Sequence, residues 1–102
     1  MTQVTLDLNN DIAAKFNNLL KVFGAKDLLV EKFIDYHIKK LKREIAQMQE
    51  DLEVYEKLYN KKSEDFYNEF EQGKLEDSED FVLWAGIYEM QLNCKQKLQK
   101  LL

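Results

Sequence analysis

The chain contains no proline and only three glycines, at positions 24, 73 and 86, so very little in it interrupts a helix. Its 102 residues suit one domain, or a small domain with an appendage. Apolar residues make up 45% of the chain and charged residues 33%, which is typical of a folded, soluble protein. A largely helical fold is therefore the first expectation.

One short segment near the N-terminus departs from that expectation. Residues 3–8, QVTLDL, alternate between polar and apolar side chains, as in a strand with one apolar face. No second strand pattern follows anywhere in the chain. Because an unpaired strand leaves a row of backbone donors and acceptors without partners, we expect it to pair with its own copy in a second chain. The segment therefore predicts a homodimer.

Two helical patterns follow, separated by Gly24. The stretch Asn9–Asp11 offers N-cap residues for the first helix, and Gly24 can adopt the left-handed conformation that ends it. Apolar side chains at spacings of three and four give this helix one apolar face: Ile12, Phe16, Leu19, Leu20 and Phe23. Asp27 can cap the second helix, in which no helix breaker occurs before Asn60. The second helix is therefore long.

This long helix carries a regular apolar seam. Its members follow alternating spacings of four and three: Ile34, Ile38, Leu41, Ile45, Met48, Leu52, Tyr55 and Tyr59. Such a heptad pattern indicates a coiled-coil contact with another helix. Two interpretations are open, because the seam can pack against the same seam of a second chain or against the C-terminal helix of its own chain. A four-helix arrangement around a dimer axis would use both contacts.

Two further helices are expected beyond Asn60. Ser63 and Ser78 are N-cap candidates, and each precedes two acidic residues that favour a helix start. The first of these helices should end near Gly73. The last helix has two apolar stripes, one formed by Phe81, Trp84, Ala85, Tyr88 and Leu92, the other by Leu83, Ile87, Met90, Cys94, Leu98 and Leu101. A helix with two apolar faces lies between other elements or binds a partner.

Residue types suited to catalysis or metal binding are scarce. The one histidine, His37, lies beside the seam, where a structural role is expected. The one cysteine, Cys94, cannot form an internal disulfide, which agrees with a reducing compartment. No phosphate-binding loop and no Cys/His spacing suited to zinc occur. We therefore expect a protein that is not an enzyme and holds no metal or cofactor.

Charge is distributed unevenly along the chain. Residues 1–45 carry eight Lys or Arg against six acidic residues, a net of +2, whereas residues 46–102 carry seven against thirteen, a net of −6. The first part can approach a polyanion and the second would be repelled by one. Apolar runs are too short to cross a bilayer and the N-terminus is not a secretory signal, so we expect a cytoplasmic protein.

Residues 3–45 resemble the ribbon-helix-helix family, the Arc/MetJ-type repressors, in their alternating strand, amphipathic helix, glycine-containing turn and apolar second helix. The resemblance implies a two-chain ribbon in the DNA major groove, with bases read by Gln3, Thr5 and Asp7. It also implies a phosphate contact at the start of the second helix, near Lys26. Asp7 departs from the family, and its carboxylate would be repelled by the DNA phosphates. The other interpretation is that the ribbon serves dimerisation alone.

Residues 59–92 resemble the C-terminal segments of small prokaryotic antitoxins from toxin–antitoxin pairs. That resemblance implies an acidic, aromatic surface that covers a small basic toxin. The aromatic anchors would be Phe66, Tyr67, Phe70, Trp84 and Tyr88. The other interpretation is that these rings fill the core of the chain itself, against the long helix.

Together these patterns predict a mostly α-helical homodimer with a ribbon-helix-helix part over residues 1–45 for dimerisation and DNA binding. Residues 46–102 would form a helical extension that folds back on the long helix and packs there or binds a partner. The expected function is that of a ribbon-helix-helix antitoxin, which binds operator DNA as a dimer and neutralises a toxin by direct binding. The alternative is a homodimeric helical coiled-coil protein that serves as an interaction module or scaffold without nucleic-acid binding.

Overall fold

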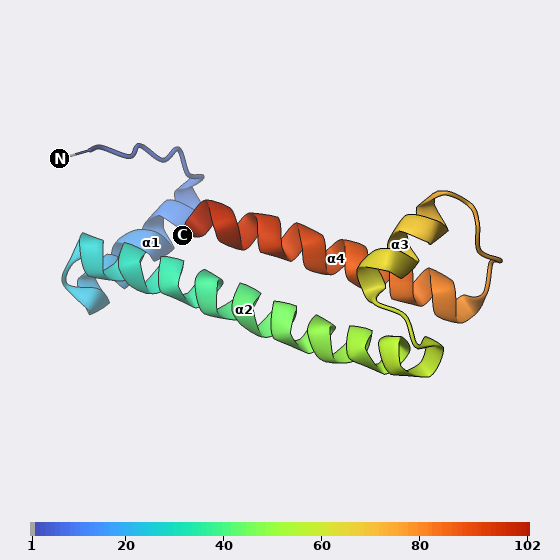
Figure 1. The fold of residues 1–102 in the computed structure, drawn as a ribbon. Coiled ribbons are helices and arrows are strands. Elements are labelled where there is room, and N and C mark those ends of the chain that lie inside the picture. Colours follow the sequence, from blue (N-terminus) through green and yellow to red (C-terminus); the bar gives the residue numbers. More distant parts are fainter. Residues whose placement is uncertain (1) are drawn as a thin grey trace. The chain divides into compact units, whose positions relative to one another are not determined.

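A computed structural model of the chain describes residues 2–102, and these residues form four helices and no strand. The helices are α1 (Asn10–Phe23), α2 (Lys26–Tyr59), α3 (Ser63–Glu71) and α4 (Glu79–Leu101), which follow one another along the chain in Figure 1. The chain divides into two compact units, the first ending at Asp35 and the second covering Tyr36–Leu102. The all-helical expectation is confirmed for the described residues.

The predicted N-terminal strand is wrong, and so is the fold class built on it. Residues 2–9 have no regular secondary structure, and Val4, Leu6 and Leu8 are exposed. The chain offers this segment no neighbouring strand, and an isolated pair of strands is only marginally stable in water. Because a ribbon-helix-helix protein requires a strand, the resemblance to that family is contradicted, together with the predicted pairing of strands in a homodimer.

Local signals set most of the helix ends as the sequence predicts. The side chain of Asn9 accepts a hydrogen bond from a backbone N–H in the first turn of α1, and Ser78 does the same for α4. Gly24 ends α1 in the left-handed region, at a φ of 79°. Asn60 follows the last residue of α2 with a φ of 50°, also left-handed. Side-chain N-caps, a left-handed glycine and a left-handed asparagine therefore mark these helix ends.

The start of α3 depends on another helix rather than on a cap of its own. Its N-cap residue, Lys62, makes no side-chain cap hydrogen bond. Instead, the Ser63 backbone N–H donates to the Glu56 carboxylate of α2 over 2.8 Å. The buried Ser63 hydroxyl accepts a hydrogen bond from the Trp84 indole N–H over 2.9 Å. The predicted role of Ser63 as an N-cap is therefore wrong, because its hydroxyl is used in the core.

An aromatic core joins α2, α3 and α4 in the second unit. Its fully enclosed members are Leu52, Phe66, Trp84 and Ala85. The rings of Phe66 and Trp84 stack with centroids 3.7 Å apart and planes within 4° of each other. Tyr55 also stacks on Trp84, at 5.7 Å. Burial of side chains of this size contributes about 1.5–3 kcal/mol each, so this cluster is the main source of stability of the unit.

A buried amide fixes α4 against α2 beyond the aromatic core. The Gln91 side chain is 2% exposed, and its Nε2 donates to the Ile45 carbonyl over 3.2 Å and to Gln49 Oε1 over 3.0 Å. A buried amide without partners is costly, so only registers that provide both acceptors are stable. Gln91 therefore favours one antiparallel register between α4 and the part of α2 that lies in the second unit.

Candidate interaction surfaces

The residues predicted to bind DNA lie in the first unit. Gln3, Thr5 and Asp7 fall in the irregular segment 2–9, and Lys26 is the first residue of α2. All four are exposed. In the described residues no ribbon exists that would carry the first three into a DNA groove. Readout of DNA bases through a ribbon therefore has no basis in this fold.

The five aromatic residues predicted to anchor a partner contribute to the core of this chain. Phe66 and Trp84 are 1% and 0% exposed. The other three, Tyr67, Phe70 and Tyr88, are partly buried and pack against the same cluster. Tyr67 and Tyr88 contact each other, with ring centroids 4.9 Å apart. These rings therefore pack inside the chain, in line with the interpretation that they fill its own core.

The seam of α2 is covered to different degrees along its length. Leu52 is buried, and Tyr55 packs against the aromatic core. Ile38, Leu41, Ile45 and Met48 are half-buried, whereas Ile34 and Tyr59 are exposed. Within the same chain, Gln91 of α4 donates to the Ile45 backbone carbonyl and Trp84 stacks on Tyr55, so α4 lies along the seam between Ile45 and Tyr55. Contact of the remaining seam with a second chain stays a prediction.

The first unit leaves a large share of its apolar side chains exposed. α1 buries none of its residues, and Ile12, Leu19 and Phe23 on its apolar face are 51%, 43% and 39% exposed. Among the described residues of this unit, only Leu29 is buried. A unit of this length with one buried side chain is too small to be stable by its own core. Its apolar surface is therefore suited to contact with other protein surface.

A second exposed apolar surface lies on α4. This helix buries Trp84, Ala85 and Gln91 on its inner face. On the neighbouring face Leu83 and Met90 are 49% and 53% exposed. Most of the first predicted stripe of α4 therefore belongs to the core, whereas the second is divided: Leu83, Met90 and Leu101 are exposed, and Ile87, Cys94 and Leu98 are half-buried.

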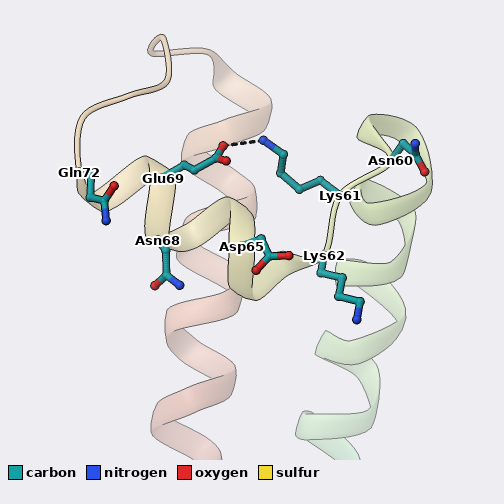
Figure 2. A pocket seen from close by; sticks show the side chains of 7 residues that line it. All are labelled: Asn60, Lys61, Lys62, Asp65, Asn68, Glu69 and Gln72. Carbon is teal, nitrogen blue, oxygen red and sulfur yellow. Dashed lines mark hydrogen bonds and ion pairs between the residues drawn. The ribbon is translucent and has the colours of Figure 1, made fainter.

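The hollow between the α2–α3 connection and α3 is polar and open to solvent. It has a volume of about 570 Å³ and seven lining residues, Asn60, Lys61, Lys62, Asp65, Asn68, Glu69 and Gln72 (Figure 2). Lys61 reaches across it to pair with Glu69 at 2.5 Å, as Figure 2 shows. No apolar side chain lines this hollow, so it lacks the apolar enclosure typical of small-molecule sites.

Three tyrosines at the edge of the core have raised pKa values. The Tyr59 hydroxyl donates to Asp80 Oδ2 over 2.5 Å, and this bond raises the pKa of Tyr59, with a smaller effect of burial. Burial raises the pKa of Tyr67, with a further contribution from a hydrogen bond to Glu71. Burial is also the main cause of the raised pKa of Tyr88. A phenol with a raised pKa stays neutral at physiological pH and acts as a hydrogen-bond donor rather than as a base.

The remaining findings concern metal ligands, the histidine, membrane spans and similarity to known proteins. In residues 2–102 no group of three or more His, Cys, Asp or Glu is placed to hold a metal ion. His37 is half-buried, and its ring lies at 87° to that of Tyr36 with the two centroids 5.3 Å apart. None of the four described helices combines the length and the apolar character that a membrane crossing requires. Protein-family models, curated proteins and solved structures give no match to this chain.

Proposed function

We propose that this chain is a homodimeric helical protein that serves as an interaction module or scaffold and has no nucleic-acid binding. One observation carries the proposal, namely the contrast between two sets of apolar side chains. The second unit closes a core of its own around Trp84 and Phe66. Outside that core, apolar rows on α1 and α4 meet solvent. Exposed apolar rows on helices are the usual contact surfaces of helix–helix association.

The acidic stretch over residues 44–91 supports the absence of nucleic-acid binding in that part of the chain, whereas residues 1–45 carry a net charge of +2. Residues 44–91 carry fourteen acidic residues against four basic ones. A surface of this sign repels phosphate groups at physiological salt concentrations. Of the aromatic rings that a toxin would need as anchors, Phe66 and Trp84 lie in the core of this chain and the other three pack against it, so the proposal does not assign them to a toxin interface.

The proposal is tested by the mass of the full chain in solution. Sedimentation equilibrium should give twice the single-chain mass of 12.2 kDa at concentrations from about 1 to 100 µM, the range in which modest interfaces form. A single-chain mass throughout would contradict the dimer. Fluorescence anisotropy with a labelled mixed-sequence DNA duplex at low salt should show no binding. Binding that weakens steeply as salt rises would contradict the second half of the proposal.

A further inference from the structure

We propose that two copies of the chain pair antiparallel through one face of α4, an inference that rests on the proposed dimer. The face is a row of residues, here called the outer row, at alternating spacings of three and four: Asp80, Leu83, Ile87, Met90, Cys94, Lys97 and Leu101. This spacing is the heptad pattern of a two-helix contact. The row begins with an acid and ends with a base and a leucine, and its middle is apolar.

The outer row flanks the face of α4 that packs inside the chain and shares three members with it: Asp80 accepts a hydrogen bond from Tyr59, Ile87 packs against the aromatic core, and the Cys94 thiol donates to Glu44. Leu83, Met90 and Leu101 are 49%, 53% and 43% exposed, and Lys97 is exposed as well. The alternate members, Asp80, Ile87 and Cys94, are half-buried at the edge of the intrachain contact. A second helix laid along the row would cover the exposed members and complete the burial of the others.

Charge complementarity selects a second copy in antiparallel orientation. Glu79 and Asp80 lie in the first turn of α4, whereas Lys95, Lys97 and Lys100 lie near its end. In the part of the chain that the structure describes, none of these three lysines forms an ion pair. Two parallel copies would place like charges together, whereas two antiparallel copies place the acidic start of each helix beside the basic end of the other.

One register satisfies the apolar and the charged positions together. Within the outer row, Leu83 of one copy lies level with Cys94 of the other, and Ile87 lies level with Met90. The same register sets Asp80 opposite Lys97. Beside the row it brings Glu79 to within about 3 Å, measured along the helix axis, of the level of Lys100. A twofold axis repeats each of these contacts, so the surface is self-complementary and the assembly closes at two chains.

Gly86 gives an independent indication of a close partner beside the row. It lies inside α4, where glycine lowers helix stability by about 0.5–1 kcal/mol relative to alanine. A Cβ built on Gly86 meets no atom within 4 Å, so packing inside the chain does not require the glycine. In the register given above, Gly86 lies level with Gln91 of the second copy and about 3 Å along the helix axis from the level of Asn93. The missing side chain leaves room there for the partner helix.

The first test replaces an apolar member of the outer row in the full chain. Met90→Glu should weaken the dimer by about tenfold or more in sedimentation equilibrium, because it places a carboxylate in the centre of the contact. Val82→Glu is the matched control, since Val82 is 55% exposed on the same helix but lies off the row. It should leave the dimer unchanged. Circular dichroism on each variant checks that the helices are retained.

The second test reverses the charge of two lysines near the end of α4. The pair Lys97→Glu and Lys100→Glu should weaken the dimer by about tenfold or more at low salt, since four contacts become repulsive. The pair Lys39→Glu and Lys40→Glu on α2 changes the net charge equally and is the control. A chain that carries Lys97→Glu and Lys100→Glu together with Glu79→Lys and Asp80→Lys should dimerise again. Circular dichroism on this variant checks that the helices are retained, because Asp80 also accepts a hydrogen bond from Tyr59. A chain with only the Lys97→Glu and Lys100→Glu substitutions, mixed with a chain that has only the Glu79→Lys and Asp80→Lys substitutions, should form a heterodimer.

The outcomes separate this proposal from the proposed function. A wild-type dimer that survives Met90→Glu and the Lys97/Lys100 reversal unchanged would overturn the α4 interface and leave the dimer to another surface, such as α1. Loss of the dimer in the reversed chain without recovery in the four-fold swap would also overturn the antiparallel register. A wild-type chain that is monomeric at every concentration would overturn both proposals.

Discussion

Removing the hydroxyl of Ser63 should expose how strongly the core depends on one buried hydrogen bond. Ser63 is 3% exposed, and its Oγ accepts a hydrogen bond from the Trp84 indole N–H at 2.9 Å. Ser63→Ala leaves that N–H buried without an acceptor, because Trp84 has no exposed surface. A buried donor without a partner costs about 1–3 kcal/mol. Against a total stability of about 5–15 kcal/mol, this is a large loss.

Urea unfolding at one fixed protein concentration measures the effect, with circular dichroism as the signal. With a urea m-value of about 2 kcal/mol/M, a loss of this size should lower the urea midpoint by about 0.5–1.5 M. Trp84→Phe removes the N–H itself, so Ser63→Ala should cost far less in that background. The double-mutant cycle should therefore show a coupling of about 1 kcal/mol or more. Equal costs of Ser63→Ala in both backgrounds would refute the reasoning.

Three further predictions concern Glu56, Tyr59 and Gly73. Glu56→Ala should lower the free energy of unfolding by about 1 kcal/mol, because it removes the acceptor for the Ser63 backbone N–H. Glu56→Gln keeps a side-chain acceptor and should therefore cost less in the same urea assay. Because the folded-state pKa of Tyr59 is raised, its stabilising effect is present below pH 10 and is lost as the pH rises above 10. Tyr59→Phe should therefore flatten the fall in urea midpoint between pH 9 and pH 11. An unchanged slope in this variant would contradict the prediction. Gly73 has a φ of 70°, so Gly73→Ala should cost about 1 kcal/mol in thermal unfolding, whereas Gly73→Asn, which tolerates this conformation, should cost less.

The helix ends could be predicted because their causes are local. Asn9, Gly24 and Ser78 act within one turn of their own helix, so a few neighbouring residues decide the outcome. The cap of α3 could not be predicted in this way. Its acceptor is Glu56, which lies seven residues before Ser63 in another helix, and only the packed structure brings the two together.

The errors at the N-terminus and the open choices in the core have a common origin. Periodicity shows which side chains share a face, but it does not show what covers that face. The alternation over residues 3–8 therefore predicted a strand for which the chain provides no partner. Likewise, the seam and the aromatic residues left their partners open, and the structure shows that α4 covers Leu52 and Phe66 within the chain. Gln91 carried no signal, because a polar residue in a helix is usually exposed.

The arrangement of two copies can be measured directly by electron–electron distances between spin labels. Cys94→Ser removes the native thiol, and single cysteines at Glu89 or Gln99 carry the label. In the antiparallel register, two labels at position 89 lie level along the helix axis, whereas two labels at position 99 are separated along it by about 30 Å, from the 1.5 Å rise per residue. A short distance at position 89 together with a long one at position 99 is the predicted result. Short distances at both positions, or no dipolar signal at either, would contradict the antiparallel dimer.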